Sequence, residues 1–177
     1  YSVKDGYVII TDCDVTAEKI VIPSEIEGVP VSEITSQAFS GAKATEIIIP
    51  ETVSKIGVQV FKDCSGITSL VIPKSVKYIG DNCFENCTAL EKVEILSTDI
   101  SMSGYAFEGC TDKFTVYAPI GSATQITANQ SGTAYIPTDC EYEVSEETVK
   151  IVKYNGSLAN ITIPSYIEGK DVTVIGA

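Results

Sequence analysis

Three consecutive segments of 23 residues copy one another between residues 44 and 112, and this repetition constrains the fold more than any other feature. The rows 44–66, 67–89 and 90–112 align without a gap. Three aligned columns stand out: Ile56/Ile79/Met102, Phe61/Phe84/Phe107 and Cys64/Cys87/Cys110. A fixed period of this length is typical of a solenoid, in which each coil covers the apolar side of the next.

Each row predicts two short extended pieces. Leu70 and Ile72 are inward apolar residues at positions i and i+2, and Pro73 ends the strand because proline cannot donate to a continuing ladder. Val76 and Ile79 predict a second inward-facing piece. No row carries an uninterrupted helical period of more than about two turns. We therefore expect a β-rich solenoid of 23-residue coils, stacked about 4.8 Å apart around one continuous core.

The segments on either side of the rows predict a cap at each end. Residues 1–16 alternate apolar and polar side chains around Asp5-Gly6, which predicts a β-hairpin over the open end of the solenoid. The coils occupy residues 17–121, and the first is enlarged by an insertion with a turn at Glu27-Gly28. Residues 122–141 predict a linker strand at 133–137 and, before it, a short closing helix containing Ala123, Ile126 and Ala128, with Ser122 as N-cap.

Residues 142–177 repeat the start of the chain. An offset of 141 residues aligns them with residues 1–36 without a gap, and 13 of the 36 positions are identical. We interpret this segment as the opening of a second, truncated cassette. Because an interrupted solenoid would expose its core, and because the chain does not begin with Met, we expect it to be a fragment of a longer protein.

The charge balance narrows the classes of partner. The chain has 24 acidic and 12 basic residues, so its net charge of −12 disfavours nucleic acid and anionic membranes. It contains no His, the commonest general base and metal ligand near neutral pH. No apolar run approaches the roughly 18 residues of a transmembrane helix. We expect no transmembrane segment in this stretch of chain.

The six cysteines are not arranged as a disulfide framework or a metal site. Those of the repeated column occupy a position that needs a small buried residue, so we predict a column of reduced thiols. Cys83 takes a packing position held by Val60 and Ala106 in the neighbouring rows. Cys13 and Cys140 lie near opposite ends of the array, and no C-x-x-C spacing is present. We predict no metal and no cofactor.

The outward residues of the first strand of each row are candidates for partner binding. They form two columns, because side chains alternate across a strand and the rows lie in register. An apolar column could be a contact strip, although Val and Ile also simply favour strands, and charged residues on the second column could serve to discourage aggregation. The columns are Val21, Ile48, Val71, Glu94, Tyr117 and Lys19, Glu46, Ser69, Lys92, Thr115.

The row pattern closely resembles the BspA-like class of leucine-rich repeat, found in secreted and surface proteins of gut and oral bacteria and some mucosal protozoa. The resemblance covers roughly residues 17–119 and resumes at Leu158. Individual rows depart from it at Thr35, Ala42, Leu96 and Ser103. The pattern that carries it is Leu70-x-Ile72-Pro73-x-Ser75-Val76-x-x-Ile79-Gly80-x-x-x-Phe84-x-x-Cys87.

The resemblance implies a secreted or cell-surface, adhesin-like module that binds a protein, or a glycan, of a host or neighbouring cell. The resemblance implies no catalytic residue in this chain. A second hypothesis is a structural spacer that holds another functional domain at a distance. A third, an enzyme, has the least support, because nothing in the rows brings two carboxylates to a fixed, shielded position. We therefore predict a binding module and not an enzyme.

Overall fold

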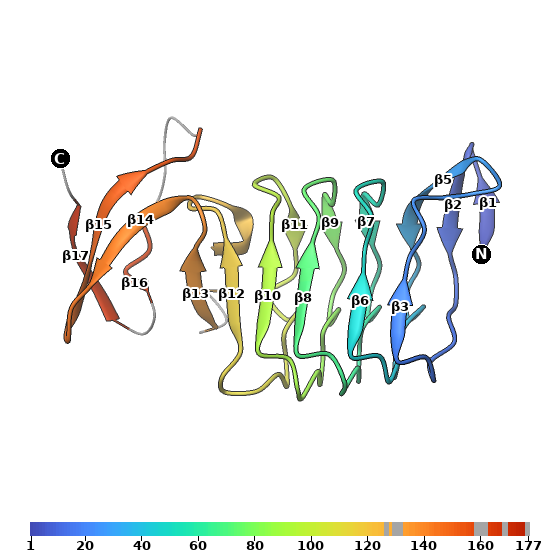
Figure 1. Cartoon of the computed structure of the whole chain (residues 1–177), viewed down its shortest axis with the longest axis horizontal. Helices are drawn as coiled ribbons and strands as arrows, with labels where there is room; N and C mark the ends of the chain where they lie inside the picture. The colour runs from blue at the N-terminus through green and yellow to red at the C-terminus, as the bar shows by residue number, and fades with distance from the viewer. Residues whose placement is uncertain (126–127, 129–132, 158–162, 168–169, 176–177) are drawn as a thin grey trace.

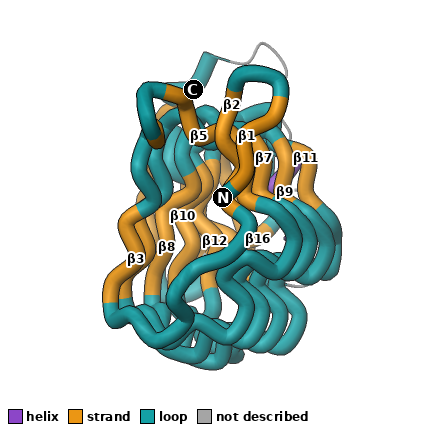
Figure 2. The backbone as a smooth tube through the Cα atoms, turned by 90° about the vertical axis from the view of Figure 1, so that its right-hand side faces the viewer, coloured by secondary structure: helices purple, strands orange, loops and turns teal. Residues whose placement is uncertain are grey.

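The chain forms an elongated β-solenoid, as predicted (Figure 1). The computed structural model describes every residue except 126–127, 129–132, 158–162, 168–169 and 176–177. Successive coils lie side by side along the array, with the N-terminus at one end and the C-terminal strands at the other. Seen along the array, two columns of strands form opposite walls and loops close each coil (Figure 2).

The first wall contains the strands that carry the Ile-x-Ile-Pro type of pattern. Parallel pairing keeps the predicted alignment, so Leu70 lies beside Val93 and Val93 beside Val116. The wall consists of two separate ladders, β3–β6 and β8–β10–β12–β13. Its strands are β3 (Lys19–Val21), β6 (Glu46–Ile48), β8 (Ser69–Ile72), β10 (Lys92–Ile95), β12 (Thr115–Ala118) and β13 (Ala134–Pro137).

The second wall is one continuous sheet that begins with the predicted hairpin. Asp5 and Gly6 both have positive φ, 50° and 83°, which suits the tight turn of a two-residue hairpin. The insertion in the first coil forms another small hairpin, in which β4 pairs with β5 around Glu27-Gly28. The strands are β1 (Ser2–Lys4), β2 (Tyr7–Ile10), β4 (Glu25–Ile26), β5 (Val29–Ile34), β7 (Lys55–Ile56), β9 (Tyr78–Ile79) and β11 (Ser101–Met102).

Columns of identical side chains stack through the core. The rings of Phe39, Phe61 and Phe84 are buried and nearly parallel, with centroids 5.7 and 5.4 Å apart. Beside them, the Sγ atoms of Cys64 and Cys87 lie 3.1 and 3.0 Å from carbonyl oxygens of the preceding row, to which they donate. All six cysteines are among the described residues and all are free there, and Cys64, Cys87 and Cys110 stack in one column as the sequence predicts.

Glycine recurs where neighbouring rows approach most closely. A Cβ atom at Gly80 would lie 2.5 Å from the backbone nitrogen of Val58, and one at Gly57 would lie 2.7 Å from that of Ser36. The Gly80 N–H also donates to the carbonyl oxygen of Ile56 at 2.9 Å. The Ile-Gly dipeptide of the rows therefore serves backbone-to-backbone packing.

The third row keeps its core despite its altered sequence. Asp99 stands where earlier rows have Val53 and Val76, which are buried. Asp99 instead points to solvent and pairs with Lys77 at 2.6 Å, while its neighbour Ile100 is buried. A one-residue shift of the apolar side chain thus fills the position.

A short helical turn follows the last complete coil, as predicted. Residues 123–125 and Ala128 are helical. The Gln125 N–H donates to Oγ of Ser122 at 3.3 Å, and the Gly121 N–H donates to Oε1 of Gln125 at 2.7 Å. These reciprocal contacts are close to a capping box and satisfy backbone donors at the helix start. Ile126, which the sequence analysis assigns to this helix, lies outside the described residues.

The C-terminal strands repeat the arrangement of the first ones. The β2–β5 ladder shifts register between Val8 and Ile9, and the β15–β17 ladder shifts between Val149 and Lys150, which is the same place after the 141-residue offset. A small second core packs Ile120 with Val149. Leu158 lies outside the described residues. The strands are β14 (Cys140–Val144), β15 (Thr148–Tyr154), β16 (Tyr166–Ile167) and β17 (Lys170–Ile175).

Candidate functional site

The first wall positions the outward residues by simple alternation. In β8, Leu70 and Ile72 are buried in the core, and the alternating residues Ser69 and Val71 face solvent. Pro73 then ends the strand. The register of each ladder places the outward residues of adjacent rows next to one another, as the sequence predicts.

The first three residues of the apolar column form an exposed aliphatic patch. Val21 is 57% exposed, Ile48 42% and Val71 50%. Val21 and Ile48 are direct partners in the β3–β6 ladder. We call these three residues the aliphatic patch. Exposed apolar side chains that are contiguous on a sheet are typical of contact surfaces.

The other end of the same column is different from the expected exposed strip. Glu94 and Tyr117 are only half-exposed. Lys92 explains this, because its Nζ lies 4.5 Å from the centre of the Tyr117 ring and 3.1 Å from Oε2 of Glu94. The lysine covers the tyrosine through a cation–π contact, so this end already has partners within the chain.

The second column is mainly polar. Nζ of Lys19 lies 2.8 Å from Oε1 of Glu46, and both side chains are about half exposed, 51% and 52%. Ser69 is exposed, and Thr115 is half-exposed beside Lys92. An exposed ion pair of this kind contributes little to stability.

Strand β13 extends both columns by one residue each, and the sequence analysis missed these residues. Ile136 pairs with Tyr117 and continues the first column, and Ala134 pairs with Thr115 and continues the second. The alternation of Tyr135 and Pro137 with Ile136 could have indicated the register, because Tyr135 and Pro137 are buried.

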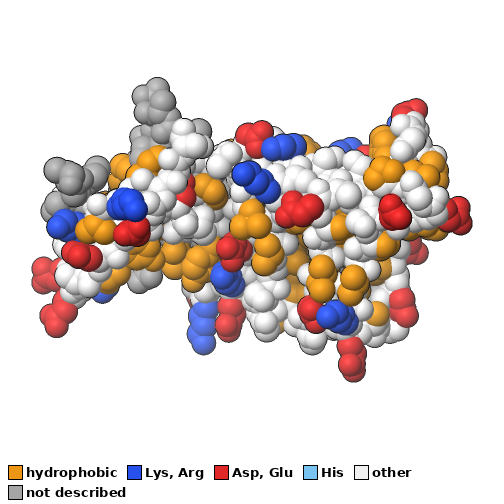
Figure 3. All heavy atoms as spheres, turned by 45° about the horizontal axis from the view of Figure 1, so that its top comes forward, with side chains coloured by type: hydrophobic (Ala, Val, Ile, Leu, Met, Phe, Trp, Pro, Cys, Tyr) orange, Lys and Arg blue, Asp and Glu red, His pale blue; other side chains and the backbone are white. Residues whose placement is uncertain are grey.

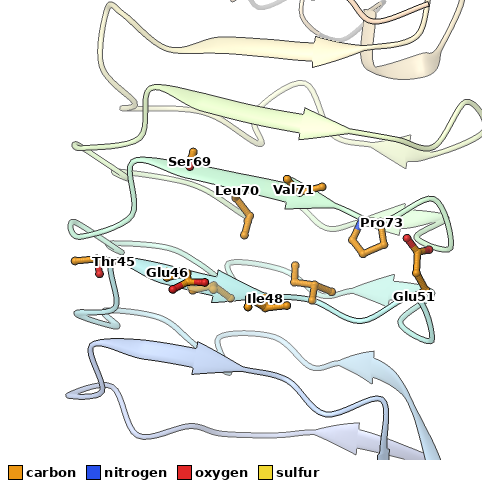
Figure 4. Close-up of a pocket in the computed structure, with 10 residues that line it drawn as sticks. Thr45, Glu46, Ile48, Glu51, Ser69, Leu70, Val71 and Pro73 are labelled. Carbon is orange, nitrogen blue, oxygen red and sulfur yellow. The ribbon is translucent and has the colours of Figure 1, made fainter.

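A groove opens next to the aliphatic patch, between β6 and β8. No ladder joins these two strands within the described residues, although the same two rows are paired on the opposite wall through β7 and β9. The groove has a volume of about 410 Å³. In Figure 4, Ile48 and Val71 lie along it, and Glu46 and Glu51 stand near its two ends.

The opposite wall carries charges that are paired across rows. Lys55 and Glu33 are 2.7 Å apart, and the Glu33 contact raises the pKa of Lys55. Lys77 is likewise paired with Asp99, which lowers the pKa of the carboxyl group. Figure 3 shows acidic and basic side chains interspersed with small hydrophobic patches over the face that it presents. The three side chains of the aliphatic patch are uncharged, and the Lys19–Glu46 ion pair lies in the same ladder as Val21 and Ile48.

The thiol groups of the core serve packing and are not reactive. Burial raises the pKa of Cys64 and Cys110 to about 11, so these thiols stay protonated and unreactive at neutral pH. No group of three acidic or cysteine side chains within the described part of the chain is placed to hold a metal ion. Among the same residues, no helix combines the length and hydropathy needed to cross a bilayer.

Comparison with known proteins agrees with the geometry. The profile of the BspA type leucine rich repeat region matches residues 12–130, with 6 copies of the repeat. The chain belongs to the BspA-type leucine-rich repeat family. Repeats of this family stack into a solenoid whose extended surface is a general protein-interaction scaffold.

Two solved structures are similar to this BspA-type chain. A leucine-rich repeat protein of T. pallidum has a TM-score of 0.55 at 22% identity, covering 75% of this chain and 74% of that one. A leucine-rich repeat protein from Bacteroides ovatus has a TM-score of 0.49 at 19% identity, covering 70% of this chain and 44% of that one. At this identity the first likeness establishes the fold alone. No curated protein matches the chain.

Proposed function

We propose that this chain is an extracellular or cell-surface, adhesin-like module of a larger bacterial protein, and that it binds a protein partner through the first wall of its solenoid. The observation that carries the proposal is the aliphatic patch of Val21, Ile48 and Val71. Three exposed aliphatic side chains lie there on neighbouring rows, and Ile48 and Val71 also line the groove between β6 and β8. A preformed surface of this kind loses little entropy on binding.

The proposal extends the strip predicted from the sequence but weights its residues differently. Val21, Ile48 and Val71 form the contact centre, with Lys19, Glu46 and Ser69 as its polar rim. The secondary part of the contact surface consists of Lys92, Glu94, Tyr117 and Thr115, because Lys92 already covers the Tyr117 ring.

Adhesion of beads coated with the chain to cultured mucosal epithelial cells tests the proposal. The variant Val21→Thr/Ile48→Thr/Val71→Thr removes the apolar character and retains β-branched side chains that suit strands. We expect it to lose adhesion while its circular dichroism spectrum and melting temperature stay close to those of the parent chain.

A matched control changes three exposed valines away from the patch, in Val3→Thr/Val58→Thr/Val144→Thr. It changes the same kind of side chain away from the patch and should adhere like the parent. Equal adhesion of the patch variant and the control variant would refute the proposed face.

A structural spacer is the second candidate function, favoured by the repetition of β1, β2, β4 and β5 in β14–β17 with the same register shift. A spacer needs length and not a particular surface. Replacing this chain, in the full-length protein, by an unrelated solenoid of equal length would leave adhesion intact if it is a spacer, and would abolish adhesion if it is the binding module.

A further inference from the structure

The first wall of the solenoid is interrupted at one place among its described strands, between β6 and β8. The interruption is local, because β7 and β9, which belong to the same two rows, remain paired. The segments just before β6 and β8 also stay in tight contact, because a Cβ at Gly66 would lie 2.7 Å from the carbonyl oxygen of Ala44. The groove is therefore a slot held open within an otherwise closely stacked array.

An additional strand does not fit into this slot. The Cα atoms of β6 and β8 approach within 8 Å of one another. A strand inserted between them would need about 9.5 Å, twice the spacing of hydrogen-bonded strands. The slot can accept side chains, while the main chain of a partner lies above the sheet.

The lining of the slot is apolar in the middle and acidic at the ends. Ile48, Val71 and Pro73 supply the apolar part, and Leu70 projects from β8 toward β6 (Figure 4). Glu46 and Glu51 are exposed and stand near opposite ends. A volume of about 410 Å³ lies within the usual range of small binding pockets, about 300–1,000 Å³.

The two carboxylates remain available to a partner. No ion pair within the described residues includes Glu51. Among the same described residues Glu46 pairs with Lys19 alone, and because both side chains are about half exposed, the pair is weak and exchangeable. The net charge of −12 adds a long-range attraction for a cationic partner.

Building on the proposed function, we propose that the slot between β6 and β8 binds an extended segment of the partner protein in which a large apolar residue lies between two cationic residues. The apolar side chain enters between Ile48 and Val71. The cationic side chains pair with Glu46 at one end and Glu51 at the other. Two lysines separated by three residues in an extended segment are about 13 Å apart, and their flexible stems adjust to the acidic ends.

Nuclear magnetic resonance titration with short peptides tests the proposal. The probe is the blocked pentapeptide Lys-Ser-Leu-Ser-Lys, with Glu-Ser-Leu-Ser-Glu and Lys-Ser-Ser-Ser-Lys as comparison peptides. We expect the first peptide to shift the methyl resonances of Ile48 and Val71, to bind more weakly as salt is added, and to bind more tightly than both comparison peptides.

Charge variants locate the contact. Glu46→Gln/Glu51→Gln should raise the Kd about threefold to tenfold, as expected for the loss of two exposed ion pairs. Glu143→Gln/Glu146→Gln removes the same charge from an exposed region of β14 and its turn, and should leave the Kd unchanged.

Either of two results overturns the proposal: equal or tighter binding of a comparison peptide, or no binding of the first peptide at any accessible concentration. The proposed function fails separately. If the aliphatic patch variant loses cell adhesion but the peptides do not bind, the interaction face stands and the basic-apolar-basic partner is wrong. If the peptide binds in the slot but the patch variant adheres normally, the slot stands and the adhesive role of the face is wrong.

Discussion

Gly80→Ala is expected to destabilise the solenoid, because the added Cβ atom would clash with the neighbouring row. The added Cβ would lie 2.5 Å from the Val58 nitrogen and 2.6 Å from the carbonyl carbon of Gly57, whereas an ordinary contact begins at 3.4 Å. All of these neighbours are backbone atoms, so no flexible side chain can move aside. The hydrogen bond from Gly80 N to Ile56 O must lengthen as the rows separate.

The size of the effect follows from two opposing contributions. Overpacking that forces a backbone shift costs about 1–3 kcal/mol. Replacing glycine by alanine also restricts the unfolded chain, which stabilises the fold by about 0.4–1 kcal/mol where the conformation is allowed. Gly104→Ala isolates this second contribution, because Gly104 has no neighbouring atom within 4 Å and no positive φ.

Urea denaturation followed by circular dichroism is a suitable assay, because the chain has no Trp. We expect Gly80→Ala to unfold at lower urea than the parent, and Gly104→Ala at the same or higher urea. Equal midpoints for the two variants would show that the rows are not held together by close backbone contact at Gly80.

The aromatic and thiol columns support further predictions. Phe84→Ala should lower the free energy of unfolding by about 3–5 kcal/mol, because the buried ring stacks on both Phe61 and Phe107, whereas the exposed Tyr105→Ala should change it by less than about 0.5 kcal/mol in the same urea assay. Burial raises the pKa of Cys64 and Cys110 from 9.0 to about 11. As the pH rises from 9 toward 11, these thiols therefore lose their protons in the unfolded chain before they do in the folded chain, which stabilises the unfolded state. The urea midpoint should fall over this range of pH. Replacing both cysteines by Ala should make that fall less steep without removing it, because burial also raises the pKa of Cys13, Cys83, Cys87 and Cys140; an unchanged pH dependence would contradict the stated cause.

The period of the sequence was sufficient to predict the coils, because each column of the rows has one structural role. Leu70, Ile72 and Phe84 are buried where the alternation and the spacing indicate. The hairpin at Asp5-Gly6 and the cap at Ser122 also follow from local chemistry alone. These features depend on nearest neighbours in the chain or on the repeat itself.

The groove could not be predicted, because it depends on the spacing between rows. Residues 46–50 and 69–73 carry the same apolar pattern, so nothing in their composition marks the place where pairing stops. Similarly, alternation places Lys92 and Tyr117 outward but does not reveal that the one covers the other. The sequence therefore predicts the face and not which part of it is open.

The residues through which each row contacts the preceding row are separated by a nearly constant number of residues in the sequence. The side chains of Gln37 and Gln59 are bonded across 22 residues, Cys87 reaches the Phe61 carbonyl across 26, and Lys19 reaches Glu46 across 27. The loop that must form to add a row is therefore equally long wherever the row lies, and its entropic cost does not grow with the array. We expect folding to start at any pair of well-packed rows and to proceed row by row in both directions. A longer protein made of such cassettes should therefore not nucleate more slowly than this one.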